Sequence, residues 1–129
     1  MQDTEAFIAE FVVEGNEKAN QLEKLLIDLE KTPGSSKLHA EAFRVLHTIK
    51  GATSFMGFTR LCALAHSGES LLVRLRDGTV APKEEITSAL LSMVDAIREI
   101  LFQIETTGKE GSADHTVLLA MLTKLHSPT

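Results

Sequence analysis

Apolar residues recur every three or four positions along most of this 129-residue chain, and no segment alternates between apolar and polar with a period of two. That spacing is typical of amphipathic helices, which bury one face and expose the other. Turn-forming residues interrupt the pattern at "TPGSS", "MGFT", "RDGTVAPKE" and "TGKEGSAD". The pattern therefore predicts five helices, over residues 3–31, 37–56, 60–76, 83–107 and 114–125.

The lengths of these helices and of their connections predict the fold. Four long amphipathic helices joined by short turns are typical of an antiparallel, up-and-down four-helix bundle, against which the shorter fifth helix can pack. Ser35 or Ser36 is a candidate N-cap for the second helix and Thr59 for the third, while Gly57 is expected in the left-handed conformation that ends the second. We expect one all-α domain over residues 1–129.

Composition narrows the class of protein. Charged residues make up 24% of the chain and apolar residues 43%, which is ordinary for a globular domain. The net charge of −5 argues against nucleic-acid binding, which needs a basic face. No apolar run approaches the roughly 20 residues of a membrane helix, and the acidic start "MQDTEAFIAE" is unlike a signal peptide. We therefore expect a soluble, cytoplasmic domain that does not insert into a membrane.

A polar group in the second predicted helix does not fit the apolar pattern. His47, Lys50 and Gly51 share a face that is offset from the apolar stripe, because residues three and four apart are neighbours on a helix. A helical side chain leans over the turn before it, so residue 51 is the natural cover for the ring of His47, and it is glycine. The expected gain is access to an imidazole edge, and Lys50 has a stem long enough to bring its ammonium close.

A second polar group lies in the third predicted helix. His66 and Glu69 are three residues apart, and the turn "MGFT" brings this helix back antiparallel to the second. At about 1.5 Å per residue, His47, His66 and Glu69 reach similar levels. A carboxylate on one imidazole nitrogen fixes the tautomer and leaves a lone pair on the other, which is the state of a nucleophilic histidine. Glu69 is therefore the candidate that orients His47.

Such a histidine can attack the γ-phosphorus of ATP and form a phosphoramidate, whose added negative charge Lys50 can partly offset. The sequence contains no Gly-rich phosphate loop and no carboxylate cluster for a metal ion. We therefore expect the chain to accept and hand on a phosphoryl group, to bind no cofactor or metal of its own, and to lack ATP-binding machinery.

The residues of this stretch resemble a known family. "HTIKG" is similar to the H-x-x-K-G signature of histidine-containing phosphotransfer (HPt) domains. The continuation "FMGFTRLCALAHSGESLL" resembles the N-terminal phospho-acceptor domain (P1) of CheA-type chemotaxis histidine kinases, with its Gly-Phe turn and A-H-x-x-E pattern. The resemblance is dense from Phe43 to Gly78 and looser over the rest of the chain, the fifth helix included.

By position, the resemblance implies that His47 is phosphorylated, that Glu69 is the hydrogen-bond partner of its ring, and that Lys50 and His66 belong to the surrounding polar network. It also implies two partners: the ATP-binding domain of the kinase, and the receiver domain of a response regulator whose aspartate takes the phosphoryl group. On its own the domain would not be an enzyme, whereas the full-length protein would be a protein-histidine kinase. Gly68, inside the third helix, has no explanation at this level.

Two alternatives remain beside this interpretation. A free-standing phosphorelay HPt module shares the chemistry but lacks the kinase context. A metal-binding helical bundle could use His47, His66 and Glu69 as zinc ligands, although bundle metal sites usually need more carboxylates. Elsewhere we expect His39, His115 and His126 at the surface, and Phe55 and Phe58 sealing the turn below the site.

Overall fold

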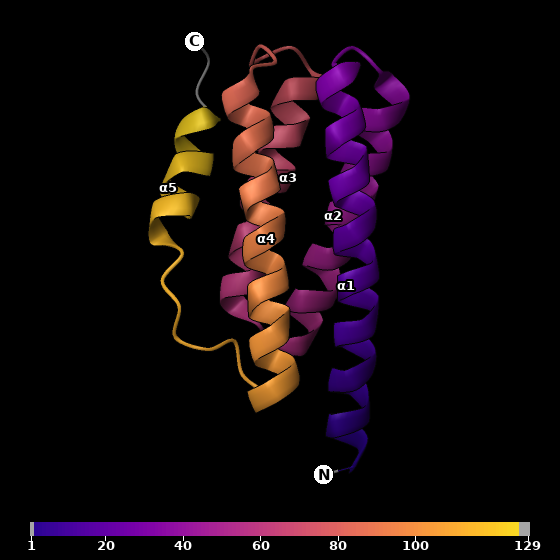
Figure 1. Ribbon diagram of the computed structural model, residues 1–129, viewed down its shortest axis with the longest axis vertical. Helices are drawn as coiled ribbons and strands as arrows, with labels where there is room; N and C mark the ends of the chain where they lie inside the picture. The colour runs from indigo at the N-terminus through magenta and orange to yellow at the C-terminus, as the bar shows by residue number, and fades with distance from the viewer. Residues whose placement is uncertain (1, 127–129) are drawn as a thin grey trace.

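The computed structural model describes residues 2–126, and the side chains from residue 4 onward. It contains the helices α1 (Gln2–Lys31), α2 (Ser36–Met56), α3 (Thr59–Arg76), α4 (Glu84–Thr107) and α5 (Thr116–Leu125). In Figure 1, α1 and α3 run upward and α2 and α4 run downward, and α5 returns upward along the outside of the bundle. All regular structure in the described part is helical, which confirms the predicted all-α bundle.

Packing follows the up-and-down order. Each of the first four helices contacts its two neighbours, α1 with α2, α2 with α3, α3 with α4 and α4 with α1, whereas α2 and α4 lie diagonally opposite each other. α5 packs against the bundle, as predicted, and contacts α3 and α4. Apolar residues of all four long helices fill the centre, and the largest fully buried ones are Leu22, Leu26, Leu46, Leu61, Leu64, Leu71, Leu72, Ile86, Leu90, Met93, Ile97 and Ile100.

The turns on either side of α2 fix its ends. Ser35 is the N-cap, and its hydroxyl accepts a hydrogen bond from the amide of Leu38. Gly57 closes the helix at φ 79°, a left-handed conformation that glycine adopts without strain. The expected cap of α3 is wrong, because Thr59 is already helical and Phe58 precedes it without a side-chain cap. A residue far along the chain supplies the missing acceptor.

That acceptor is Glu110, in the loop between α4 and α5. Its carboxylate accepts hydrogen bonds from the backbone amides of Arg60 at 3.3 Å and Leu61 at 3.1 Å, two amides of the first turn of α3. The guanidinium of Arg60 in turn donates to the carbonyl oxygens of Gly111 and Ala113. This reciprocal contact ties the loop to α3. After the loop, α5 begins at Thr116, two residues later than expected.

Four residues lie in places other than those expected. Phe55 does not seal the turn, because 86% of it is exposed, whereas Phe58 does pack inward, with its ring 5.3 Å from that of Phe11. His39 is buried rather than superficial, and its Nε2 donates to the carbonyl of Pro33 at 2.8 Å. His126 is half-buried and donates to the carbonyl of Ser67. His115 too is half-buried. Helical periodicity thus wrongly predicted that these three histidines lie at the surface.

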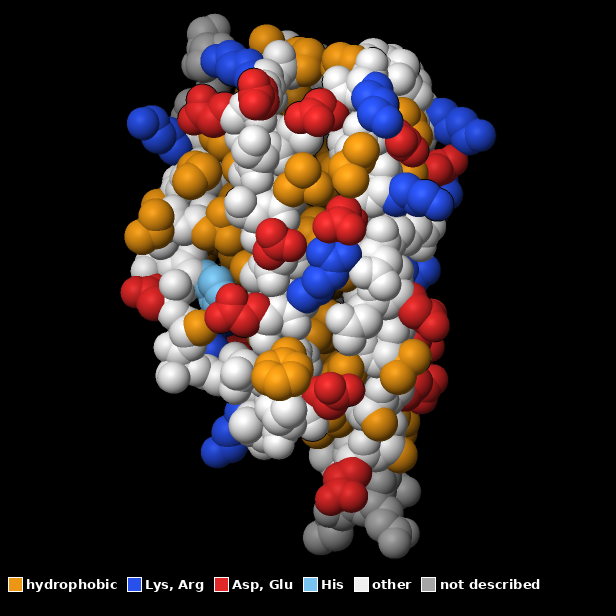
Figure 2. Space-filling model, viewed as in Figure 1, with side chains coloured by type: hydrophobic (Ala, Val, Ile, Leu, Met, Phe, Trp, Pro, Cys, Tyr) orange, Lys and Arg blue, Asp and Glu red, His pale blue; other side chains and the backbone are white. Residues whose placement is uncertain are grey.

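Figure 2 shows the face formed by α4 and α1, where acidic and basic side chains are interspersed with single hydrophobic ones. An ion pair between Arg98 of α4 and Glu23 of α1, at 3.0 Å, crosses this face. None of the helices in residues 2–126 combines the length and the hydropathy needed to cross a membrane.

Candidate functional site

The candidate site lies between α2 and α3. Because the two helices are antiparallel and joined by a tight turn, His47 and Glu69 reach the same level, and Nδ1 of His47 lies 2.6 Å from Oε2 of Glu69. An ionised carboxylate can only accept, so Nδ1 carries the proton. The other ring nitrogen, Nε2, makes no hydrogen bond within residues 2–126.

Glu69 is itself held in place from a second direction. The ammonium of Lys50 donates to its other oxygen, Oε1, at 2.7 Å, so each carboxylate oxygen has one partner from α2. Burial of Glu69 disfavours its charge, but the hydrogen bonds from Lys50 and His47 and their charges outweigh that effect and lower the pKa of Glu69 below its usual 4.5. The carboxylate is therefore ionised at neutral pH.

The exposure of these side chains differs along the site. The side chain of Glu69 is 10% exposed and that of Lys50 is 24% exposed, but that of His47 is 59% exposed. Gly51, one turn after His47, is at the surface, and a β-carbon added there would have no atom within 4 Å. The imidazole is thus anchored on its buried side and open on its outer side.

Gly68 now has a physical explanation. A β-carbon at this position would lie 2.2 Å from Sδ of Met93 in α4 and 3.1 Å from Cδ2 of Leu46 in α2. The glycine therefore lets α3 approach both neighbouring helices at the residue that precedes Glu69. The sequence pattern could not predict this, because the need for glycine comes from residues more than twenty positions away.

His66 is the one predicted site residue that the structure does not join to the others. It is exposed, and none of the hydrogen bonds or ion pairs in the described chain joins it to His47 or Glu69. The physical reason is helical phase, since a residue three positions from another lies about 60° around the helix. Glu69 faces α2, and His66 points outward. The structure therefore gives no support to the network role implied for His66.

The structure gives no support to the metal-binding alternative either. Within residues 2–126, no group of three or more His, Cys, Asp or Glu side chains is arranged to hold a metal ion. Of the three proposed zinc ligands, only His47 and Glu69 lie together, and Glu69 has both of its oxygens in hydrogen bonds.

An aromatic neighbour of His47 was missed by the sequence analysis. The ring of Phe43, four residues earlier on α2, stacks on the imidazole with centroids 5.7 Å apart and planes 13° from parallel. The guanidinium carbon of Arg76 lies 5.9 Å from the centroid of the same Phe43 ring. The i, i+4 spacing of Phe43 and His47 was an available signal for this contact.

Comparison with known proteins identifies the family. The family model of the Hpt domain matches residues 6–100, which include α2, α3 and the whole candidate site. The chain belongs to the Hpt domain family. The matched region ends within α4, so α5 lies outside it.

Relatives of this Hpt domain are much longer proteins. The sensor histidine kinase CheAY of Helicobacter pylori is 34% identical over 110 residues, which cover 85% of this chain and 14% of that protein. The chemotaxis protein CheA of Halobacterium salinarum is 34% identical over 102 residues, covering 79% of this chain and 15% of that protein. The chain thus spans about a seventh of the length of these two relatives.

Solved structures agree with the fold. The histidine phosphotransfer domain of CheA superposes with a TM-score of 0.85 at 29% identity, covering 93% of this chain and 91% of that one. The CheA phosphotransferase domain from Thermotoga maritima has a TM-score of 0.75 at 32% identity, covering 78% of this chain and 95% of that one. The similarity of the Hpt domain to these structures extends over nearly the whole bundle.

Proposed function

We propose that this Hpt domain carries a phosphoryl group on His47 within a CheA-type chemotaxis kinase. It would receive the group from ATP bound to a separate domain of the kinase and pass it to an aspartate of a response regulator. Glu69 would orient the imidazole, Lys50 would hold Glu69, and Gly51 would leave the ring accessible. The domain alone would not be an enzyme, because the catalytic machinery for ATP lies elsewhere.

One observation carries the proposal: the 2.6 Å contact between Nδ1 of His47 and Oε2 of Glu69 on an imidazole that is otherwise exposed. A proton fixed on Nδ1 leaves the lone pair on Nε2, on the side that a partner can reach. A histidine that only stabilised the bundle would not need an exposed ring, and a freely solvated histidine would not need a buried carboxylate.

The transfer step follows from this tautomer. Nε2 attacks the γ-phosphorus in line, a nitrogen–phosphorus bond forms, and the bond from that phosphorus to the β,γ-bridging oxygen breaks to release ADP. The ring still holds its proton on Nδ1, so positive charge develops on the imidazole, and the carboxylate of Glu69 stabilises that charge. In the second step, a carboxylate oxygen of an aspartate attacks the same phosphorus and Nε2 leaves with its lone pair.

The kinase context rests on the relatives. They are named as sensor histidine kinase and chemotaxis proteins, and this chain matches a small share of their length, which leaves room there for an ATP-binding domain. A structure with the same fold is described as the phosphorylated P1 domain of CheA3 in complex with CheY6. The supply of ATP places the proposed reaction in the cytoplasm. A coding sequence that continues past Thr129 into an ATP-binding domain would separate this proposal from a free-standing phosphorelay module.

The direct test is phosphorylation of the His47→Gln variant by the cognate kinase catalytic region and ATP. Glutamine has no imidazole nucleophile, so incorporation of acid-labile phosphate should fall to background while the helical circular dichroism is unchanged. His66→Gln is the matched control, since His66 is exposed and makes no hydrogen bond to His47 or Glu69 within residues 2–126, and this variant should be phosphorylated normally. Labelling of His47→Gln at the parental level would refute the proposal.

A further inference from the structure

A row of residues on the outer face of α2 contains more than the proposed nucleophile. Phe43, His47, Gly51 and Phe55 follow one another at intervals of four, and such rows form the ridges of a helix surface. Phe43 stacks on the imidazole from one end of the row. Phe55 stands at the other end, on the far side of Gly51.

Phe55 contributes little to the bundle. It is 86% exposed, the largest exposed fraction of any large hydrophobic side chain in the described part of the chain. Single exposed hydrophobic residues are ordinary on protein surfaces, and Phe7 and Phe102 are further examples here. What distinguishes Phe55 is its position on the ridge of His47 rather than its exposure alone.

The geometry around His47 leaves one side for a partner. Glu69 occupies Nδ1, and Phe43 covers the ring along the ridge on the side away from Gly51. A β-carbon at Gly51 would meet no atom within 4 Å, so the space over that turn is open. Helical side chains lean toward the preceding turn, which directs Phe55 toward Gly51. A partner that reaches Nε2 over Gly51 therefore meets Phe55.

The size of protein interfaces supports the same conclusion. Phe55 is eight residues after His47, about 12 Å along the helix axis. A standard interface buries about 800 Å² per partner, roughly a disc of 16 Å radius. An interface centred on Nε2 would thus include Phe55, and aromatic residues are enriched among those that contribute most to binding.

Two protein partners must reach Nε2 under the proposed function, but they need this surface to different degrees. The ATP-binding domain would belong to the same polypeptide, as the length of the relatives indicates, and a tether supplies an effective concentration of the order of millimolar. We take the receiver domain to be a separate molecule, as CheY6 is in its complex with the P1 domain of CheA3. Its encounter with His47 then depends on the contacts that the two surfaces make. A docking residue therefore benefits the receiver most.

We propose that Phe55 is a docking residue for the receiver domain that takes the phosphoryl group from His47. This inference rests on the proposed function. Phe55 binds an apolar patch beside the acceptor aspartate, while His47, eight residues away, presents the phosphoryl group. Phe55 touches no reacting atom, so it affects how tightly the receiver binds and leaves the chemical step unchanged.

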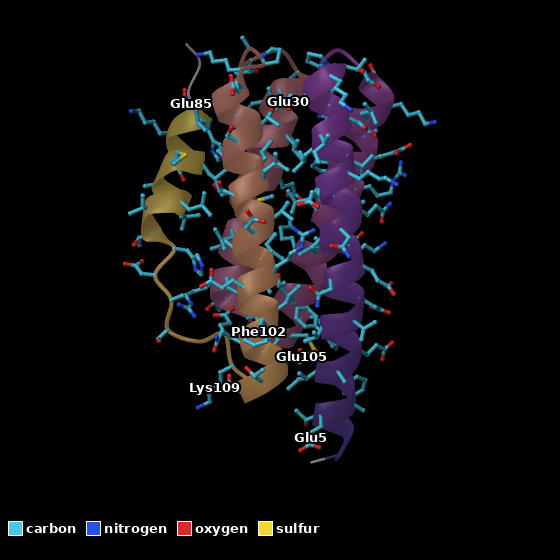
Figure 3. The ribbon with its side chains drawn as sticks, in the orientation of Figure 1. Glu5, Glu30, Glu85, Phe102, Glu105 and Lys109 are labelled. Carbon is cyan, nitrogen blue, oxygen red and sulfur yellow. The ribbon has the colours of Figure 1, made fainter. Side chains whose placement is uncertain are left out.

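The test compares Phe55→Ala with Phe102→Ala, which removes an equally large exposed ring, itself 59% exposed, from α4, the helix diagonally opposite α2. Figure 3 shows Phe102 at the lower part of α4. Each variant is first loaded with phosphate by the kinase catalytic region and ATP, then repurified. It is next mixed with increasing amounts of the CheY-type receiver from the same organism, and the half-saturating receiver concentration and the maximal transfer rate are measured.

For Phe55→Ala we expect the half-saturating concentration to rise about fivefold or more, with the maximal rate within about twofold of the parent. Phe102→Ala should match the parent, and Phe55→Leu should restore most of the affinity because it remains apolar. Equal half-saturating concentrations for Phe55→Ala and Phe102→Ala would overturn the inference. So would a defect of Phe55→Ala confined to the loading step, which would assign Phe55 to the ATP-binding domain. Failure of the parent chain to load would overturn the proposed function as well, and that result is visible before any receiver is added.

Discussion

The site has two walls, one formed by α2 and one by α3, and the two walls differ most in the surroundings of their glycines. On α2, Gly51 adjoins open space beside an imidazole that is 59% exposed. On α3, Gly68 lies against Met93 and Leu46, next to a carboxylate that is 10% exposed. The exposed wall allows reaction with another protein, while the buried wall keeps the orienting group fixed. The same residue type thus gives access on one helix and close packing on the other.

The largest effect is expected from removing the orienting group. Glu69→Ala should slow phosphorylation of His47 by about 10–100-fold, because the imidazole loses the acceptor that fixes its tautomer. The free energy of unfolding should change less than the activation barrier, since the flexible stem of Lys50 lets its ammonium turn to solvent. The measurements are the initial rate of phosphorylation and urea denaturation.

Glu23→Ala provides the matched control for that variant. Glu23 also accepts a hydrogen bond from a basic side chain, Arg98, but it does so on the α1–α4 face. Its removal should leave the phosphorylation rate unchanged. If Glu69→Ala is phosphorylated as fast as the parent, Glu69 does not orient His47, and the buried wall has no role in the reaction.

The second-largest effect is expected on stability, from substitution of Gly68 on the buried wall. Gly68→Ala should lower the free energy of unfolding by about 1–2 kcal/mol, because the added methyl group overpacks the contact with Met93 by more than the helix gains from alanine. Chemical denaturation gives this value. In the Met93→Ala background the penalty for Gly68→Ala should shrink, and strict additivity of the two substitutions would show that the contact with Met93 is not the cause.

On the exposed wall, replacing the glycine should change the free energy of unfolding in the opposite direction. Gly51→Ala should raise the free energy of unfolding by about 0.5–1 kcal/mol, since alanine is the better helix former and its methyl group meets no atom within 4 Å. The phosphorylation rate should stay within about twofold of the parent. Gly51→Leu separates access from helix propensity, because its longer side chain should slow phosphorylation while the helix remains stable. Destabilisation by Gly51→Ala would contradict the open environment.

The smallest effect concerns pH. The pKa of Glu69 is below its usual 4.5 in the folded domain, so its ionised form contributes stability that is present above pH 4.5 and is lost as the pH falls through the folded pKa. The stability advantage of the parent over Glu69→Gln should therefore decline as the pH drops below 4.5. Lys50→Met should raise the pKa of Glu69, which carbon NMR of its carboxyl group can follow. If the stability difference between the parent and Glu69→Gln does not change with pH, the charge of Glu69 does not contribute to stability.

The sequence predicted the elements better than it predicted their contacts. Helical periodicity and the breakers Pro33, Gly57 and Pro82 placed the ends of the helices within two residues of those observed. The pairing of His47 with Glu69 also followed, because a short antiparallel turn relates the levels of two helices by counting. These are features that local sequence determines.

The errors share a different cause. His66 was grouped with Glu69 by level along the helix, although its direction around α3 takes it away from α2. Phe55 was assigned to the turn because it is apolar, whereas the bundle leaves it exposed. Glu110, which caps α3 from a distant loop, and Gly68, whose neighbours come from α2 and α4, depend on tertiary packing that one helix does not encode.

The central claim is that Nε2 of His47 is the nucleophile and that Nδ1 is held by Glu69. Nitrogen NMR of the imidazole-labelled domain, recorded before and after phosphorylation, tests it most directly. The account predicts a proton on Nδ1 in the free domain and, after phosphorylation, a nitrogen–phosphorus coupling at Nε2 of His47. A phosphoryl group on Nδ1 of His47, or on any other residue, would contradict it.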